Sequence, residues 1–274
     1  MIKRRWLLAG FSALAAITLA PAAQAQSIDH SHAERTALLK KHVVLQQDVR
    51  ATQVRYAGMA QDRAALKAYL KNLEGVSQAA FDGYSKPQQM AFLINAYNAA
   101  TVELILTKYP DLASIKDLGS LLSSPWKPKI VALLGARYSL DNIEHDMLRA
   151  RGRYDDPRVH FAVNCASIGC PALREEAFSA DKLEAQLDEQ STRFMSDRSR
   201  NRWNAQSGKL EVSKIFDWFG EDFRLGLKGI TSANAFYAKY ADRLADAPAE
   251  RERVRTMTAS VAYLEYDWKL NDAR

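Results

Sequence analysis

The chain has 274 residues, 47% of them hydrophobic, which is enough for one large domain or two small ones with a substantial core. Three of its 38 basic residues lie in a predicted signal peptide that contains no acidic residue, so the rest of the chain, with 32 acidic residues, has a charge near +3. This near balance gives no argument for a nucleic-acid partner, and no later apolar run is long enough to span a bilayer.

Residues 1–25 have the pattern of a secretory signal peptide. Basic residues at positions 3–5 precede an apolar run over 6–20, and Ala-Gln-Ala at 23–25 is a small-x-small cleavage site. We expect cleavage after Ala25 and a periplasmic or secreted protein with no membrane span after cleavage. The rest divides into a polar lead and first helix at 26–49 and one domain at 50–274.

The first elements are helical. His30 and His32 lie in the polar lead and are predicted to be solvated. The apolar pattern predicts a helix from Ala33 to Val44, a short extended piece at 54–56 and an amphipathic helix at 62–73.

A long helix is predicted at 88–108, with Pro87 as its first residue. Its apolar residues occupy nearly every face of the helix, which predicts a buried central helix. Asn95 and Asn98 share one of its faces. Because an unpaired buried amide costs about 1–3 kcal/mol, each must have a partner, which is either neighbouring backbone or a group of a functional site.

Three short elements follow. They are a helix at 115–122, a β-hairpin pairing 130–134 with 137–140, and a helix that ends at Arg149 and is capped by Ser139 or Asp141. Glu144 and His145 lie on the last of these, with side chains about 100° apart around its axis.

Both cysteines lie between Arg158 and Cys170, in a stretch that also contains His160. Apolar and polar residues alternate over 159–165, which predicts a strand, and the following Ala-Ser-Ile-Gly-Cys-Pro predicts a turn. Cys165 and Cys170 would form a disulfide if this turn brings their Cα atoms within about 7 Å.

The C-terminal part alternates helices and short strands. The expected elements are a helix at 179–195, a polar loop at 198–207, a strand at 209–212, an aromatic core cluster at 215–219, a helix at 233–244 and a final strand and tail at 259–270. The predicted fold is therefore α+β, a helix-rich single domain with a small, mostly antiparallel sheet around a buried central helix.

A cysteine nucleophile needs a base, and the strand prediction places His160 and Cys165 on opposite faces, so the turn must swing Cys165 back or the base is His145. Glu144 or Asn164 would orient the imidazole. No histidine follows Cys165, which excludes the papain-like and transglutaminase-like order unless the fold is permuted. Serine nucleophiles rank lower because the chain has no Gly-x-Ser-x-Gly motif, and no spacing matches a familiar zinc site.

Four motifs, Phe92–Ala99, Tyr138–His145, Pro157–Cys165 with Cys170-Pro171, and Val212–Trp218, together resemble the DUF547 family over about residues 50–270. The family is named for having no known function. The resemblance implies a set of shared polar positions, which we expect to converge on one cleft: Asn95, Asn98, Glu144, His145, Arg158, His160, Asn164, Cys165, Cys170, Ser213 and Lys214.

We expect an exported hydrolase or acyl transferase without a cofactor or metal. Its catalytic residues would be Cys165, His160, His145, Glu144 and Asn164, with the backbone of 166–169 as oxyanion donor. Binding of a small molecule or peptide would involve Asn95, Asn98, Arg158, Ser213 and Lys214. The rival hypothesis is a non-catalytic envelope domain for binding or accessory roles, pinned by a disulfide between Cys165 and Cys170. The sequence leaves the oligomeric state open.

Overall fold

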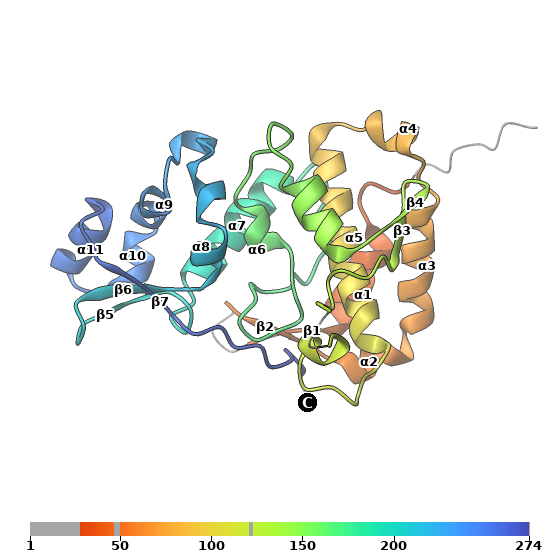
Figure 1. The fold of residues 1–274 in the computed structure, drawn as a ribbon, viewed down its shortest axis with the longest axis horizontal. Helices are drawn as coiled ribbons and strands as arrows, with labels where there is room; N and C mark the ends of the chain where they lie inside the picture. Colours follow the sequence, from red (N-terminus) through yellow and green to blue (C-terminus); the bar gives the residue numbers. More distant parts are fainter. Residues whose placement is uncertain (1–27, 47–49, 121–122, 274) are drawn as a thin grey trace, which may run out of the picture.

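The structure, a computed structural model, describes residues 28–46, 50–120 and 123–273. Figure 1 shows an elongated molecule in which helices α1–α5 gather at one end, strands β5–β7 lie with α9–α11 at the other, and α6–α8 lie between. Each end has its own cluster of buried apolar side chains. The predicted signal peptide lies outside the described residues.

The first cluster surrounds helix α5 (Lys86–Leu106). Ser85 caps α5 through a capping box with Gln88, and Pro87 occupies its first turn. Every residue from Met90 to Val102 is buried, so α5 is the central helix that the sequence predicts. Around it lie α1 (Ala33–His42), α2 (Tyr56–Gln61), α3 (Arg63–Glu74), α4 (Gln78–Asp82), η1 (Ile115–Leu118) and the antiparallel hairpins β1 (Val43–Leu45)–β2 (Thr52–Val54) and β3 (Val131–Leu133)–β4 (Ala136–Tyr138).

The second cluster packs helices against a three-stranded sheet in the order β5-β6-β7. Its pair β5–β6 is antiparallel and β6–β7 is parallel. The elements are β5 (Arg202–Asn204), β6 (Lys209–Val212), α8 (Ile215–Trp218), η3 (Gly220–Arg224), η4 (Leu227–Gly229), α9 (Ala233–Lys239), α10 (Ala241–Leu244), α11 (Pro248–Arg255) and β7 (Val261–Tyr263).

Two elements join the clusters, α6 (Val159–Ala162) and α7 (Leu183–Met195), whereas the π-helix η2 (Asn142–Leu148) packs into the first. On α6, Val159 and Ala162 pack into the first cluster, whereas Phe161 packs into the second. The C-terminal tail returns from β7 to the first cluster, where Asn271 and Ala273 pair with Val54. The site therefore forms where two cores meet.

The fold class is confirmed as helix-rich α+β, with three small sheets that are mostly antiparallel. The strand predicted at 159–165 is wrong, because every residue from 159 to 164 is buried, and alternation cannot distinguish a strand from a helical turn that is buried all round. Strand β1 replaces the last residues of the first predicted helix, and β5 lies within the loop predicted at 198–207. Of the final strand and tail predicted at 259–270, only 261–263 form a named strand.

His32 also differs from its prediction as a solvated residue. It is only 2% exposed, and its Nδ1 lies 2.8 Å from the Tyr69 hydroxyl. No described helix is long and apolar enough to cross a membrane.

Candidate functional site

A pocket of about 180 Å³ lies where the two clusters meet. Five of its lining residues contact one another through their rings and form an aromatic wall, which we define as Trp126, Trp218, Phe219, Tyr266 and Trp268. The other lining residues bring together polar groups of η2, α6 and the cysteine loop. A mostly apolar pocket with a few convergent polar groups is the usual form of a small-molecule site.

The pocket is lined by a disulfide between Cys165 and Cys170, with an S–S distance of 2.05 Å and a Cα–Cα distance of 6.1 Å. Ala166, at φ 61°, turns the chain between them. The Cys165 sulfur lies 3.1 Å from both the Ser167 and Tyr266 hydroxyls. Neither sulfur is a thiol in this state, so Cys165 is not the free nucleophile that the sequence predicts. The predicted disulfide between Cys165 and Cys170 is present.

Asn164 shapes this loop. Its Nδ2 donates to Pro171 O at 2.8 Å, and its Oδ1 accepts from the Ala166 N–H at 2.9 Å. The structure therefore places the Asn164 side chain on the backbone of the loop, whereas the sequence placed it beside a histidine.

His160 is paired with Asp222, a residue that is not among the predicted site residues. Its Nε2 lies 2.8 Å from Asp222 Oδ2, and its ring stacks on Phe219 with 4.1 Å between centroids. Arg149 Nε donates to the same Asp222 oxygen at 2.6 Å. Asp222 therefore holds the imidazole in place and is itself held by a cation.

Burial and the neighbouring charges determine the protonation state and the tautomer of His160. Burial alone would raise the pKa of Asp222, but hydrogen bonds from His160 and Arg149 outweigh it and hold that pKa well below its usual range. Burial lowers the pKa of His160 below its usual value, against the opposing effect of Asp222. A neutral imidazole beside an ionised acceptor donates from Nε2, which leaves the Nδ1 lone pair without a described partner.

In His145, as in His160, the ring proton is on Nε2, but for a different reason. Arg149 Nη1 lies 2.6 Å from His145 Nδ1, and an arginine only donates, so this nitrogen accepts and the proton of the neutral ring is on Nε2. The nearest acidic group, Asp141, is 3.9 Å from Nε2, which is too far for a hydrogen bond. His145 thus offers a donor at the pocket, and His160 offers an acceptor.

Glu144 reaches the pocket from η2, next to His145. π-Helical turns are rare and occur often at functional sites. Burial and the neighbouring Glu144 carboxylate raise the pKa of Tyr97 well above its usual range. The predicted residues Glu144, His145, His160 and Cys165 all line this one pocket.

Asn95 and Asn98 bind backbone, which was one of the two alternatives for them. Asn95 pairs with both the N–H and the C=O of Phe178, at 3.0 and 2.7 Å. Asn98 donates to Ala162 O at 2.9 Å and accepts from the Asn164 N–H at 2.8 Å. Asn98 therefore fixes the segment between His160 and Cys165 to the central helix.

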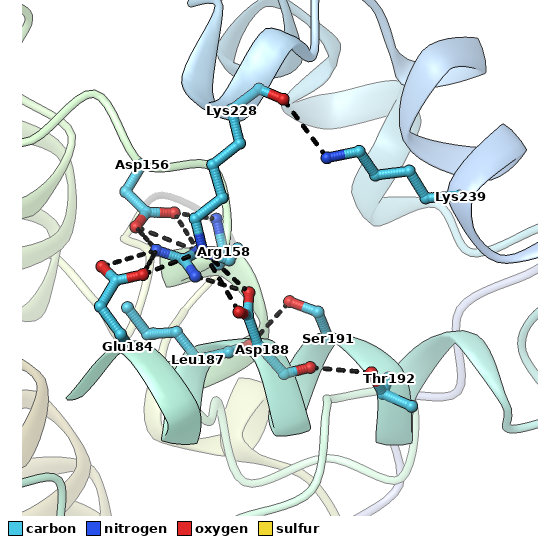
Figure 2. Close-up of polar contacts among 9 residues, drawn as sticks. All are labelled: Asp156, Arg158, Glu184, Leu187, Asp188, Ser191, Thr192, Lys228 and Lys239. Atoms are coloured by element: carbon cyan, nitrogen blue, oxygen red, sulfur yellow. Dashed lines mark hydrogen bonds and ion pairs between the residues drawn. The ribbon is translucent and has the colours of Figure 1, made fainter. Parts of the chain in front are cut away.

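Arg158 lies in a cluster of ion pairs and is not among the lining residues of the pocket. Figure 2 shows its guanidinium surrounded by the carboxylates of Asp156, Glu184 and Asp188, the last two on α7. Lys228 of η4 pairs with the same two helix carboxylates. This cluster ties α6 and α7 to the second core and gives Arg158 structural partners.

Ser213 and Lys214 also have local partners. The Ser213 hydroxyl accepts from the Ile215 N–H at the start of α8, and Lys214 pairs with Asp217 at 3.4 Å. The amides of the turn at 166–169 are mostly engaged as well, because Ala166, Ile168 and Gly169 donate to oxygens of the chain. The prediction that this turn supplies oxyanion donors is therefore wrong for these three residues.

Arg149 and most of the aromatic wall, like Asp222, are not among the site residues predicted from the sequence. The cluster of aromatic residues at 215–219 was predicted as core, yet Trp218 is 43% exposed at the pocket. The density of Tyr and Trp at 263–268 was the one signal for the rest of the wall. Among the described residues, no group of three or more His, Cys, Asp and Glu side chains has the arrangement of a metal site.

Fold and site together define a helix-rich α+β domain with an aromatic-walled pocket that contains a His–Asp pair and a disulfide. Residues 81–195 match the model of the DUF547 family, described as a protein of unknown function. The resemblance is therefore confirmed for this segment, which contains the first three motifs but not the fourth, Val212–Trp218. No curated protein and no solved structure matches the chain. The match contains His160 and both cysteines but ends before Asp222 and before Trp218, Phe219, Tyr266 and Trp268 of the wall.

Proposed function

We propose that the protein is exported to the periplasm or beyond and that its pocket hydrolyses an ester- or amide-like bond, with His160 as the general base. The signal-like pattern at residues 1–25 supports export, and a disulfide is typical of oxidising compartments. The observation that carries the enzymatic part is the His160–Asp222 pair, which leaves a basic nitrogen at an apolar pocket.

In this mechanism, water is the nucleophile. His160 Nδ1 removes a proton from water as its oxygen bonds to the substrate carbonyl carbon, and Asp222 stabilises the imidazolium that forms. The Nε2–H of His145 donates to the oxyanion. When the tetrahedral intermediate collapses, the bond to the leaving group breaks and the imidazolium returns its proton to that group.

A thiol route is the second candidate, because the Cys165 sulfur lines the same pocket as both histidines. It requires the disulfide to be reduced, after which a Cys165 thiolate would attack the carbonyl and form an acyl-enzyme. Such an intermediate would serve hydrolysis or acyl transfer. The non-catalytic binding domain uses the same pocket without bond cleavage.

The test is a panel of p-nitrophenyl esters and anilides with the exported protein in oxidised form. We expect hydrolysis that is insensitive to iodoacetamide and that falls about 100-fold or more in His160→Gln, the usual contribution of a general base. His30→Gln is the matched control, because it makes the same exchange at a histidine that contacts Tyr84 and is not among the residues that line the pocket.

The outcomes separate the three functions. Hydrolysis that appears only after reduction and is abolished by iodoacetamide would support the thiol route. Oxidised protein that retains full activity in His160→Gln would overturn the general-base proposal. An absence of turnover in both redox states, together with saturable ligand binding, would support the non-catalytic domain.

A further inference from the structure

We infer that the pocket takes a ligand with an ammonium group, which pairs with Glu144 and lies against the aromatic wall. The inference deepens the proposed function, since it rests on the same pocket and names the class of its substrate. The geometry points to a compact cation on an apolar body, because the pocket volume is about 180 Å³.

Glu144 is a buried carboxylate without a cationic partner. It is 9% exposed, it lines the pocket, and no described Lys, Arg or His forms an ion pair with it. Buried charges in proteins are normally paired, because burying an isolated carboxylate is costly. A ligand cation would supply the missing partner.

The other lining groups do not supply a positive charge. Among the described residues that line the pocket there is no lysine or arginine, and the only other carboxylate is that of Asp141. The nearest arginine to the histidines, Arg149, is committed to Asp222 at 2.6 Å. Burial keeps the pKa of His160 low, so this ring is neutral near pH 7.

The aromatic wall suits a cation. Trp218, Tyr266 and Trp268 contact one another with ring centroids 4.5 to 5.8 Å apart. The Lys116 ammonium lies 3.9 Å from the centroid of the Trp268 ring, so this wall already holds one cation of the chain. Aromatic rings that enclose a carboxylate are a known solution for binding ammonium groups, since the negative ring faces attract the cation.

A neutral ring, such as that of a sugar, would also stack on Trp218. It would leave the Glu144 carboxylate unpaired, because a hydroxyl supplies a hydrogen bond but no charge. The charge is therefore the property that separates the two ligand classes.

The probe pair is choline and 3,3-dimethyl-1-butanol, which have the same shape and differ in charge. Binding to the full oxidised protein is measured by calorimetry and by tryptophan fluorescence. We expect choline to bind at least about tenfold more tightly than the neutral alcohol, and Glu144→Gln to remove this preference. Asp141→Asn, at a lining carboxylate that is more exposed, should change the preference less.

Equal affinity for the two probes, or an unchanged preference in Glu144→Gln with a native melting temperature, would overturn the inference. The inference would also be overturned if methyl glucoside bound to the pocket while choline, at a 10-fold molar excess over the sugar, did not bind. His160→Gln keeps the test independent of the enzymatic proposal, since it should retain the choline preference even where hydrolysis fails. Choline binding without hydrolysis of any ester would refute the hydrolase and leave the ammonium site.

Discussion

Replacing Asp222 with asparagine should lower the pKa of His160 without moving its proton from Nε2. In a simple His–Asp pair, an asparagine can turn its NH₂ toward the histidine and force the other tautomer. Here Arg149 and His160 both bind Asp222 Oδ2. Because Arg149 can only donate, the amide oxygen of the new side chain must occupy that position, and His160 continues to donate to it.

The magnitude follows from the loss of charge at this oxygen. A hydrogen bond to a charged group contributes about 1.5–3 kcal/mol, and a neutral one about 0.5–1.5 kcal/mol. The difference, about 1 to 1.5 kcal/mol for the protonated imidazole, lowers the pKa of His160 by about one unit. With the weaker bond to Arg149, the free energy of unfolding at pH 7 should fall by about 2–3 kcal/mol.

The assay needs no substrate. Long-range ¹H–¹⁵N spectra of the imidazole report which nitrogen carries the proton, and a pH titration of the same signals gives the pKa. Asp217→Asn is the control, because Asp217 is an exposed carboxylate of the neighbouring helix that pairs with Lys214. A proton on Nδ1 in Asp222→Asn, or a pKa that rises, would refute the account of this network.

Three further predictions concern stability. Burial lowers the pKa of His32 to about 4, so the folded state binds this proton less readily than the unfolded state does. The free energy of unfolding should therefore fall by about 3 kcal/mol as the pH drops from about 6.5 to about 4. Urea unfolding of His32→Gln should show a weaker dependence of this free energy on pH. Arg35 is fully buried, and neither of its terminal nitrogens has a hydrogen-bond partner among the described residues, so Arg35→Met should raise the free energy of unfolding by about 1–4 kcal/mol. Arg158→Met, which removes a paired cation, should instead lower it by about 3 kcal/mol. Asn95→Leu and Asn98→Leu should each cost about 2–5 kcal/mol, but only the second should shift the His160 resonances.

The sequence predicted the elements that depend on local signals. Pro87 marks the start of α5, and the apolar residues on nearly every face of this helix indicate that it is buried. The hairpin β3–β4 and strand β6 were predicted from alternation and turn residues. Polar side chains of one pocket were also found, because motifs placed Glu144, His145 and His160 together.

The rest depends on contacts between distant residues. Asp222 is 62 residues from His160, and it lies in a short 3-10 turn that shows no periodic pattern. Alternation at 159–165 was read as a strand because a sequence does not reveal that both faces of a segment are buried. The roles of Asn164 and Arg158 depend on which backbone and carboxylates surround them, which local patterns do not specify.

The division of the site between two cores has a consequence for its chemistry. His160 lies on α6, which packs into both clusters, and its orienting carboxylate comes from the second cluster. The Arg158 cluster holds α7 and η4 together at the same junction. A loosening of this junction would separate Asp222 from His160, and the imidazole would lose the partner that fixes its tautomer before either core unfolded. The tautomer of His160 is therefore coupled to the packing of the two clusters more closely than to the stability of either one.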